Sequence, residues 1–172
     1  LDIAVPNDYM VGAGDTVLIQ IFGTENNEHE LEVSRDGRII VPDVGAYLVG
    51  GLTFGEVKKF IRSKVQERIL GADVVVSMPE LRSVRVFVMG DAFKPGPYVL
   101  SALSSMTHAI FAAGGISDIG SLRKVELKRA GKTVTTLDLY DLLINGDSSN
   151  DAILKSGDVI IVAPVGDRIT VE

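Results

Sequence analysis

Residues 84–115 read VRVFVMGDAFKPGPYVLSALSSMTHAIFAAGG, and this stretch decides the fold. Its first residues alternate between valine and another side chain up to Gly90, which is the two-residue period of a β-strand. Residues 94–97 predict a turn with Pro95 and Gly96 at its centre, because proline fixes its own φ and glycine can adopt a positive φ. Residues 98–100 then return as a second strand.

A short helix follows this hairpin. Ser105 is a suitable N-cap for an apolar helix over residues 106–113, with Ile110 and Phe111 predicted to face inward. The pair Gly114-Gly115 ends the helix, as glycine commonly does. Two strands in a hairpin with a helix across them are the opening of a β-grasp module.

The first 80 residues predict a smaller, β-rich domain. Residues 16–22 alternate as a strand after a turn at Gly14-Asp15, and a loop over residues 23–30 leads to a short strand at 31–33. Asp36-Gly37 predicts a type I′ hairpin turn, which would pair 31–33 with residues 39–41, a strand ended by Pro42.

One long helix is predicted in this half of the chain. Thr53 and Glu56 have the spacing of a capping box, and apolar residues recur every fourth position from Val57 until Gly71 stops the helix. A strand follows over residues 72–78, and proline at position 79 predicts its end.

The last third of the chain predicts a second hairpin over residues 124–128 and 133–137, then a helix capped by Asp138. A buried strand over residues 159–162 follows Gly157-Asp158, much as the first strand follows Gly14-Asp15. Each of these two aspartates is expected to hydrogen-bond the backbone of its own turn.

Several of these motifs resemble one family. The Val-x-Val-x-Val-x-Gly strand, the Lys-Pro-Gly-Pro-Tyr turn and the helix ending in two glycines resemble the SLBB module, a ligand-binding β-grasp, of bacterial polysaccharide-export proteins. The motifs upstream resemble the export domain of the same family. The turn and cap residues that carry the resemblance, all expected to be structural, are Gly14, Asp15, Asp36, Gly37, Pro42, Gly45, Thr53, Gly90, Pro95, Gly96, Gly114, Gly115, Gly157 and Asp158.

The predicted fold class is α+β, with a small β-rich export domain that carries one helix and a β-grasp (ubiquitin-like) SLBB domain. Residues 1–80 are expected to form the export domain and residues 81–165 the SLBB domain. Residues 166–172 alternate as a strand and resemble the first strand of the module, so they predict the start of a second, truncated SLBB module. The source gene is therefore expected to continue beyond them.

Composition excludes several classes of protein. With 172 residues, 46% of them hydrophobic, the chain suits one large or two small packed domains. A net charge of −6 argues against a general affinity for nucleic acid. The absence of cysteine removes disulfides and thiol catalysis. No run approaches the roughly 18 apolar residues of a membrane helix.

No catalytic, cofactor or metal site is predicted, and the chain is not expected to be an enzyme. His29 lies near three glutamates that could share a metal, but an exposed loop histidine explains it more simply. His108 is interpreted as a partly exposed surface residue. The glycines at 12 and 14 precede a strand, whereas a phosphate loop precedes a helix. No nucleophile elbow is present.

Two groups of basic residues have both a simple and a functional interpretation. The basic face of the long helix is most simply a solvated surface, and contact with an acidic partner is the alternative. Basic side chains of the second hairpin would protect a sheet edge, or contact a neighbouring subunit or an anionic polysaccharide. The two groups are Lys58, Lys59, Arg62 and Lys64, and Arg123, Lys124, Lys128, Arg129 and Lys132.

The resemblance implies the periplasmic portion of an outer-membrane exporter of capsular or extracellular polysaccharide. In that family the full-length subunits form a homo-oligomeric ring, the polymer passes through its lumen, and the partner is an inner-membrane polysaccharide co-polymerase. A soluble saccharide-binding or small-molecule-binding β-grasp module without a transport role is the alternative. A glycan-processing enzyme is disfavoured because no catalytic constellation is present.

Overall fold

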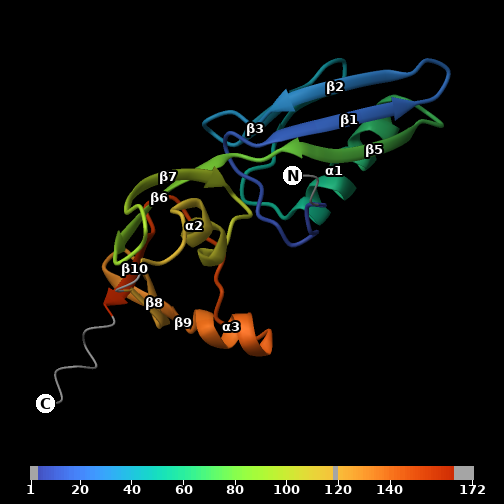
Figure 1. Ribbon diagram of the computed structural model, residues 1–172. Coiled ribbons are helices and arrows are strands. Elements are labelled where there is room, and N and C mark those ends of the chain that lie inside the picture. Colours follow the sequence, from blue (N-terminus) through green and yellow to red (C-terminus); the bar gives the residue numbers. More distant parts are fainter. Residues whose placement is uncertain (1–3, 118–119, 165–172) are drawn as a thin grey trace, which may run out of the picture. The chain divides into compact units, whose positions relative to one another are not determined.

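The computed structural model describes residues 4–117 and 120–164 (Figure 1). The chain forms two compact units, Leu1–Arg82 and Ser83–Glu172. Helices and several sheets combine in a mixed α+β fold, as predicted. The predicted start of another module at 166–172 lies outside the described residues.

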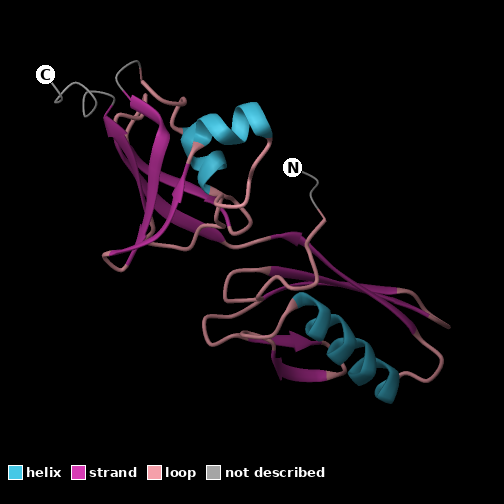
Figure 2. Cartoon of the chain, turned by 90° about the horizontal axis from the view of Figure 1, so that it is seen from below, coloured by secondary structure: helices cyan, strands magenta, loops and turns pink. Residues whose placement is uncertain are grey.

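A three-stranded antiparallel sheet of order β2-β1-β5 organises the first unit. One face of β1 carries Val17, Ile19 and Ile21, which are almost completely buried. Figure 2 shows α1, the longest helix, lying along one face of this sheet. The elements are β1 (Thr16–Phe22), β2 (Asn27–Glu32), β5 (Asp73–Glu80) and α1 (Phe54–Arg68).

The prediction of a type I′ turn that pairs residues 31–33 with 39–41 is wrong. Gly37 has a positive φ of 83°, but Asp36 does not, and the Gly37 amide donates to the Ser34 carbonyl at 2.9 Å. The strand that follows, β3 (Arg38–Val41), pairs with β4 (Gly45–Leu48) in a separate two-stranded sheet. A type I′ turn needs two positive φ angles, and only one is present.

The boundaries of two strands in this unit also differ from the predictions. β2 begins at Asn27, inside the predicted loop, because pairing with β1 overrides the low strand propensity of its polar residues. β5 continues past Pro79 to Glu80, so the prediction that Pro79 ends it is wrong. The register with β1 shifts here, and a bulge on an edge strand tolerates the missing N–H of proline.

Both halves of the predicted capping box are present at the start of α1. The Thr53 hydroxyl accepts a hydrogen bond from the Glu56 amide at 3.2 Å, and the Glu56 carboxylate accepts one from the Thr53 amide at 3.0 Å. Val57, Ile61 and Val65 are buried, as their spacing predicted.

The second unit contains a five-stranded sheet of order β7-β6-β10-β8-β9, with β10 in the middle. β10 runs parallel to β6 and antiparallel to β8. Figure 2 shows two short helices together on one side of this sheet. The elements are β6 (Ser83–Gly90), β7 (Gly96–Ser101), α2 (Met106–Ala112), β8 (Gly120–Arg129), β9 (Lys132–Leu137), α3 (Leu139–Asn145) and β10 (Val159–Pro164).

Two predictions about the central stretch are corrected. Gly96 does not lie at the centre of a tight turn: it is the first residue of β7 and pairs with Val88. The preceding connection is fastened to the end of α2, where the Lys94 amide donates to the Ala113 carbonyl at 2.8 Å. Phe111 does not face inward either, because its side chain is 57% exposed. The buried side of this short helix carries Met106, Ala109 and Ile110 instead.

Candidate functional site

Among the residues that the structure describes, Asp15 and Asp158 are the charged side chains that are buried. Both side chains are fully buried, and each directly precedes a strand, β1 or β10. Each follows a glycine with a positive φ, 94° at Gly14 and 90° at Gly157. Because a buried carboxylate is costly unless its oxygens are paired, the donors around each one define its role.

Asp15 joins three segments of the first unit. Its carboxylate accepts hydrogen bonds from the Tyr9 hydroxyl at 2.9 Å and from the Gly12 amide at 2.9 Å. Arg82 supplies two more donors, its backbone amide at 2.6 Å and its guanidinium Nη1 at 2.8 Å. The lead-in, the first turn and the segment that follows β5 are therefore held at one carboxylate.

Asp158 is held in a similar way in the second unit. It accepts from the Lys155 amide at 2.7 Å, and Arg129 donates to both of its oxygens, from Nε at 2.9 Å and from Nη2 at 2.8 Å. Such a bidentate pair is the strongest arrangement of these two groups. The hydrogen bond to Asp158 is the main cause that raises the pKa of Arg129.

The two sites repeat one local arrangement. In each, the aspartate carboxylate accepts from the amide three residues earlier, and its own amide donates to the carbonyl of that same residue at 3.1 Å. The sequence predicted these turn hydrogen bonds but missed the arginines, which lie 67 and 29 positions away in the chain. We call the two sites the Asp–Arg clamps.

The prediction that the basic residues of the second hairpin point outward must also be corrected, because some of them pair with acidic residues of the chain. Arg129 does not point outward as an edge-protecting residue but lies in the second clamp. Arg123 is 3.5 Å from Asp138 and stacks on the Tyr140 ring at 4.3 Å. Three of the five cluster members therefore have an acidic neighbour within the chain, Lys124 being the third, with Glu126 at 3.7 Å.

The environment of Tyr9 changes its acidity. Burial raises the pKa of its phenol above the ordinary value, and the hydrogen bond to the Asp15 carboxylate raises it further. The phenol therefore stays protonated and serves as a donor to Asp15. The sequence contained no signal for this role, because Tyr9 lies six residues before Asp15 and no turn or cap motif relates the two positions.

The other motif residues lie in separate turns and do not converge on one site. Asp36 is exposed, accepts a hydrogen bond from the Ser34 hydroxyl and lies 3.3 Å from Arg38. The hydrogen bond from Ser34 is the main cause that lowers the pKa of Asp36. Pro42 follows β3, Pro95 precedes β7, and Thr53 caps α1. Positive φ angles occur at Gly14, Gly37, Gly45, Gly90, Gly96, Gly114, Gly115 and Gly157.

The two histidines do not lie in a metal site. His29 belongs to β2, where alternation places it on the face opposite to Glu28 and Glu30. Within residues 4–117 and 120–164, no group of three or more His, Asp or Glu side chains could hold a metal ion. His108 has a role that the sequence did not reveal: its Nδ1 accepts from the Ser105 amide at 3.0 Å and caps α2.

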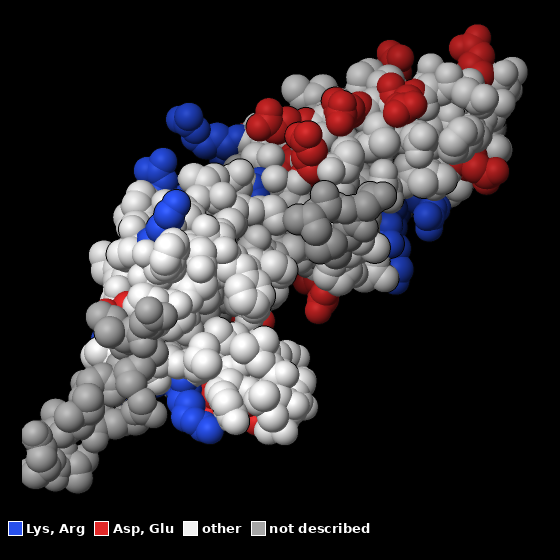
Figure 3. Space-filling view, in the orientation of Figure 1, with Lys and Arg blue, Asp and Glu red and all other residues white. Residues whose placement is uncertain are grey.

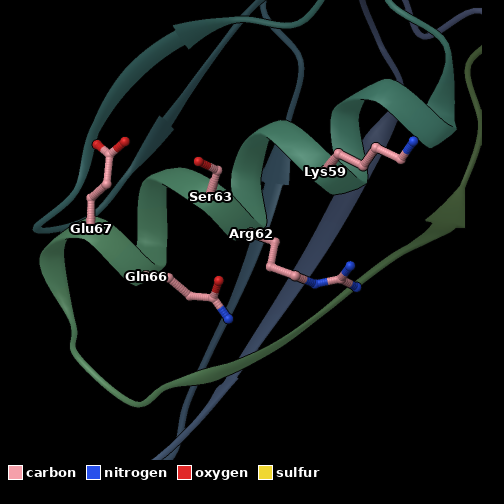
Figure 4. A pocket seen from close by; sticks show the side chains of 5 residues that line it. All are labelled: Lys59, Arg62, Ser63, Gln66 and Glu67. Atoms are coloured by element: carbon pink, nitrogen blue, oxygen red, sulfur yellow. The ribbon is translucent and has the colours of Figure 1, made fainter.

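A surface hollow lies along α1 and is open to solvent (Figure 4). One helix provides all five residues that line it, and in Figure 4 Arg62 and Gln66 reach to one side while Ser63 and Glu67 reach to the other. Gln66 is fixed by a 3.1 Å hydrogen bond to the Ala72 carbonyl. This hollow is an exposed polar helix face rather than an enclosed ligand cavity.

Charge is divided between two faces of the first unit (Figure 3). Glu28, Glu30 and Glu32 are exposed and lie on one side of β2, which we call the acidic row. Lys59 and Arg62 are exposed on the outward side of α1, which we call the basic face. Among the described residues, none of these five side chains forms an ion pair within the chain.

In the part of the chain that the structure describes, no helix has the length and apolar character needed to cross a membrane.

Comparison with known proteins matches both units to known domains. The family model described as polysaccharide biosynthesis/export protein matches residues 3–79, and the family model of the SLBB domain matches residues 84–162. The chain thus carries a polysaccharide export domain followed by an SLBB domain. The relatives are named for transport or export, in agreement with the prediction that the chain is not an enzyme.

Individual relatives are similar to this chain over most of its length. The polysialic acid transport protein KpsD of Escherichia coli is 30% identical over 159 residues, which are 91% of this chain. The EPS I polysaccharide export outer membrane protein EpsA of Ralstonia nicotianae is 29% identical over 151 residues, or 87% of the chain. The matched parts are only 28% of KpsD and 39% of EpsA, so the chain spans a minor part of each relative.

Proposed function

We propose that this chain is the periplasmic portion of an outer-membrane polysaccharide exporter and forms part of a ring-shaped conduit for capsular or extracellular polysaccharide. The observation that carries this proposal is the succession of two matched domains, export domain then SLBB domain, in one chain. The relatives named for polysaccharide transport or export match across both units.

The functional division follows the two units. We assign residues 1–80 to the export domain and residues 81–165 to the SLBB domain. The first clamp fastens the export domain to Arg82, the last residue of the first compact unit, and the second clamp lies within the SLBB domain. The clamps contribute rigidity: their carboxylates are fully paired, and no buried side-chain nitrogen or oxygen in the described part of the chain lacks a partner. A conduit needs such fixed walls, and it moves the polymer without making or breaking bonds.

In the full-length protein, copies of this chain assemble into a homo-oligomeric ring at the outer membrane. An inner-membrane polysaccharide co-polymerase delivers the polymer to it. The open hollow on α1 supports this role over storage of a small ligand, because ligand sites are normally concave and enclose most of the ligand.

Deletion of the gene in its source bacterium tests the proposal. We expect surface polysaccharide to disappear while polymer accumulates inside the cell, and we expect the full-length gene to restore export. Normal surface polysaccharide in the deletion strain would reject an export role. Titration of the purified chain with oligosaccharides and small metabolites in a calorimeter provides the second arm, since tight, saturable binding would favour the ligand-binding alternative.

A further inference from the structure

We propose that the acidic row of one copy binds the basic face of the next copy, so that the first units assemble head to tail. This inference rests on the proposed ring and names the surfaces that would join its subunits. Each copy has one surface of each charge, so the contact uses two different patches and repeats in one direction. Such heterologous contacts produce closed rings when the rotation between copies closes.

The placement of the acidic row on an open sheet face is the first part of the evidence. Glu28, Glu30 and Glu32 lie opposite Gln20, Leu18 and Thr16 of β1, on the face that does not carry the buried valine and isoleucines. Residues two apart in a strand are separated by about 7 Å, so the carboxylates form a regular row. Because three like charges in a row repel each other, this face favours a cationic partner.

The same sheet face also offers apolar area beside the acidic row. Phe22 and Val75 are 42% and 47% exposed and lie on neighbouring strands, with Phe22 paired to Asp73 and Gln20 paired to Val75. Exposed ion pairs alone contribute little to binding. Apolar side chains next to the charged row would add buried area to a contact whose direction and register come from the charges.

The basic face provides the complementary half. α1 buries Val57, Ile61 and Val65, and a helix repeat of 3.6 residues therefore directs Lys59 away from the core. Lys59 and Arg62 are separated by only about 4.5 Å along the helix axis, and their long side chains can spread to reach neighbouring carboxylates about 7 Å apart. Two other basic residues of α1 have partners within the chain, since Lys58 lies over the Phe54 ring at 4.6 Å and Lys64 lies 3.8 Å from Glu67, whereas Arg68 lies in the last turn of the helix.

Two variants, each with the charge of one surface reversed, test this contact. One variant carries Glu28→Lys and Glu30→Lys, and the other carries Lys59→Glu and Arg62→Glu. Each variant alone has like charges on both surfaces, whereas a mixture of the two restores both complementary contacts. We expect sedimentation velocity at low salt to show association of the mixture about tenfold or more tighter than that of either variant alone, and to show its loss at high salt.

A matched variant separates position from net charge. Lys94→Glu with Lys132→Glu changes the charge by the same amount as the α1 variant, at exposed positions of the second unit. We expect it to self-associate as the wild type does, while the α1 variant alone does not. Equal melting curves by circular dichroism show that all variants fold.

Two results would overturn the inference: a mixture that associates no more tightly than its components, or a Lys94/Lys132 variant that loses association equally. If α1 instead binds anionic polysaccharide, the mixture of the two variants will associate no more tightly than either variant alone, which is the first of these results. Sedimentation velocity measures only association between copies of the chain and does not depend on polysaccharide export. Failure here together with restored polysaccharide export by the full-length gene would reject these surfaces and leave the proposed function intact.

Discussion

Asp15 and Asp158 show how single residues stabilise each unit. A carboxylate removed from water loses its hydration, and only charged or well-aligned donors offset that loss. Each clamp supplies an arginine and a turn amide, and the first adds the hydroxyl of Tyr9. The beginning of β1 is thereby fastened to Arg82, and the beginning of β10 to the end of β8.

Arg129→Ala should destabilise the second unit by about 1.5–3 kcal/mol, because a buried carboxylate loses two charge-assisted hydrogen bonds. Urea unfolding of the variant and the wild type measures this difference. Arg85→Ala is the matched control, since Arg85 is exposed and we expect its loss to change stability by no more than about 0.5 kcal/mol. Equal unfolding midpoints for both variants would show that the clamp contributes nothing.

Tyr9 should make the first unit sensitive to alkaline pH. Its pKa is raised in the folded state, so the protonated phenol stabilises the fold below the unfolded pKa of about 10, and this contribution is lost as pH rises further. We expect Tyr9→Phe to be less stable at neutral pH because Asp15 loses a donor. Its free energy of unfolding should also fall less steeply above pH 10 or so than that of the wild type.

Urea unfolding at several alkaline pH values compares the two slopes. The comparison with the phenylalanine variant cancels the titration of lysines, which both proteins share. Parallel curves for wild type and variant would contradict the role of the phenol as a buried donor.

At the scale of elements, Gly90 controls how closely β6 approaches β10. A Cβ built on Gly90 would lie 2.2 Å from the Val162 carbonyl oxygen, and the residue also has a φ of 83°. Gly131, with a φ of 79°, has no atom within 4 Å of its Cβ position. The two glycines thus share a backbone conformation and differ in the space around them.

Gly131→Ala should therefore cost about 1–3 kcal/mol for the unfavourable φ alone. Gly90→Ala should cost more, on the order of 4 kcal/mol or above, because two strands must also move apart. Thermal and urea unfolding of the two variants give the comparison. Equal losses would mean that the strands separate at little cost.

Local patterns predicted the elements that depend on neighbouring residues. The alternation in β1 and β6 and the capping box of α1 needed only short stretches of sequence. The errors came from contacts between distant segments. β2 is longer than its polar residues predict because β1 pairs with it, and Phe111 is exposed because a seven-residue helix turns only one side to the sheet.

The Asp–Arg clamps show the same division within one site. The turn amides that bind Asp15 and Asp158 are three residues away, so a turn pattern was enough to predict them. Arg82 comes from the link between β5 and β6, and Arg129 from the end of β8. No periodic signal marks such a residue, and only the folded arrangement brings it to the carboxylate.

At the scale of the whole molecule, we expect weak self-association. The net charge of −6 makes identical copies repel, and exposed charge pairs bring modest gains. Light scattering of the 172-residue chain at micromolar concentration and physiological salt should therefore give the mass of a monomer, whereas the proposed contact between first units is measured at low salt and higher concentration. A stable ring under these conditions would show that the layers of the longer protein are not needed for assembly.

Because β10 fills the middle of its sheet, the second unit can close only late in synthesis. Ribosomes deliver a chain from its N-terminus, so the first unit has all its strands once Arg82 has emerged. β6 and β8 are synthesised earlier and cannot be joined into one sheet until Val159–Pro164, the strand between them, has been synthesised. Every nascent copy thus passes through an interval in which a finished N-terminal unit is joined to an open sheet, exposed to proteases and to wrong pairing.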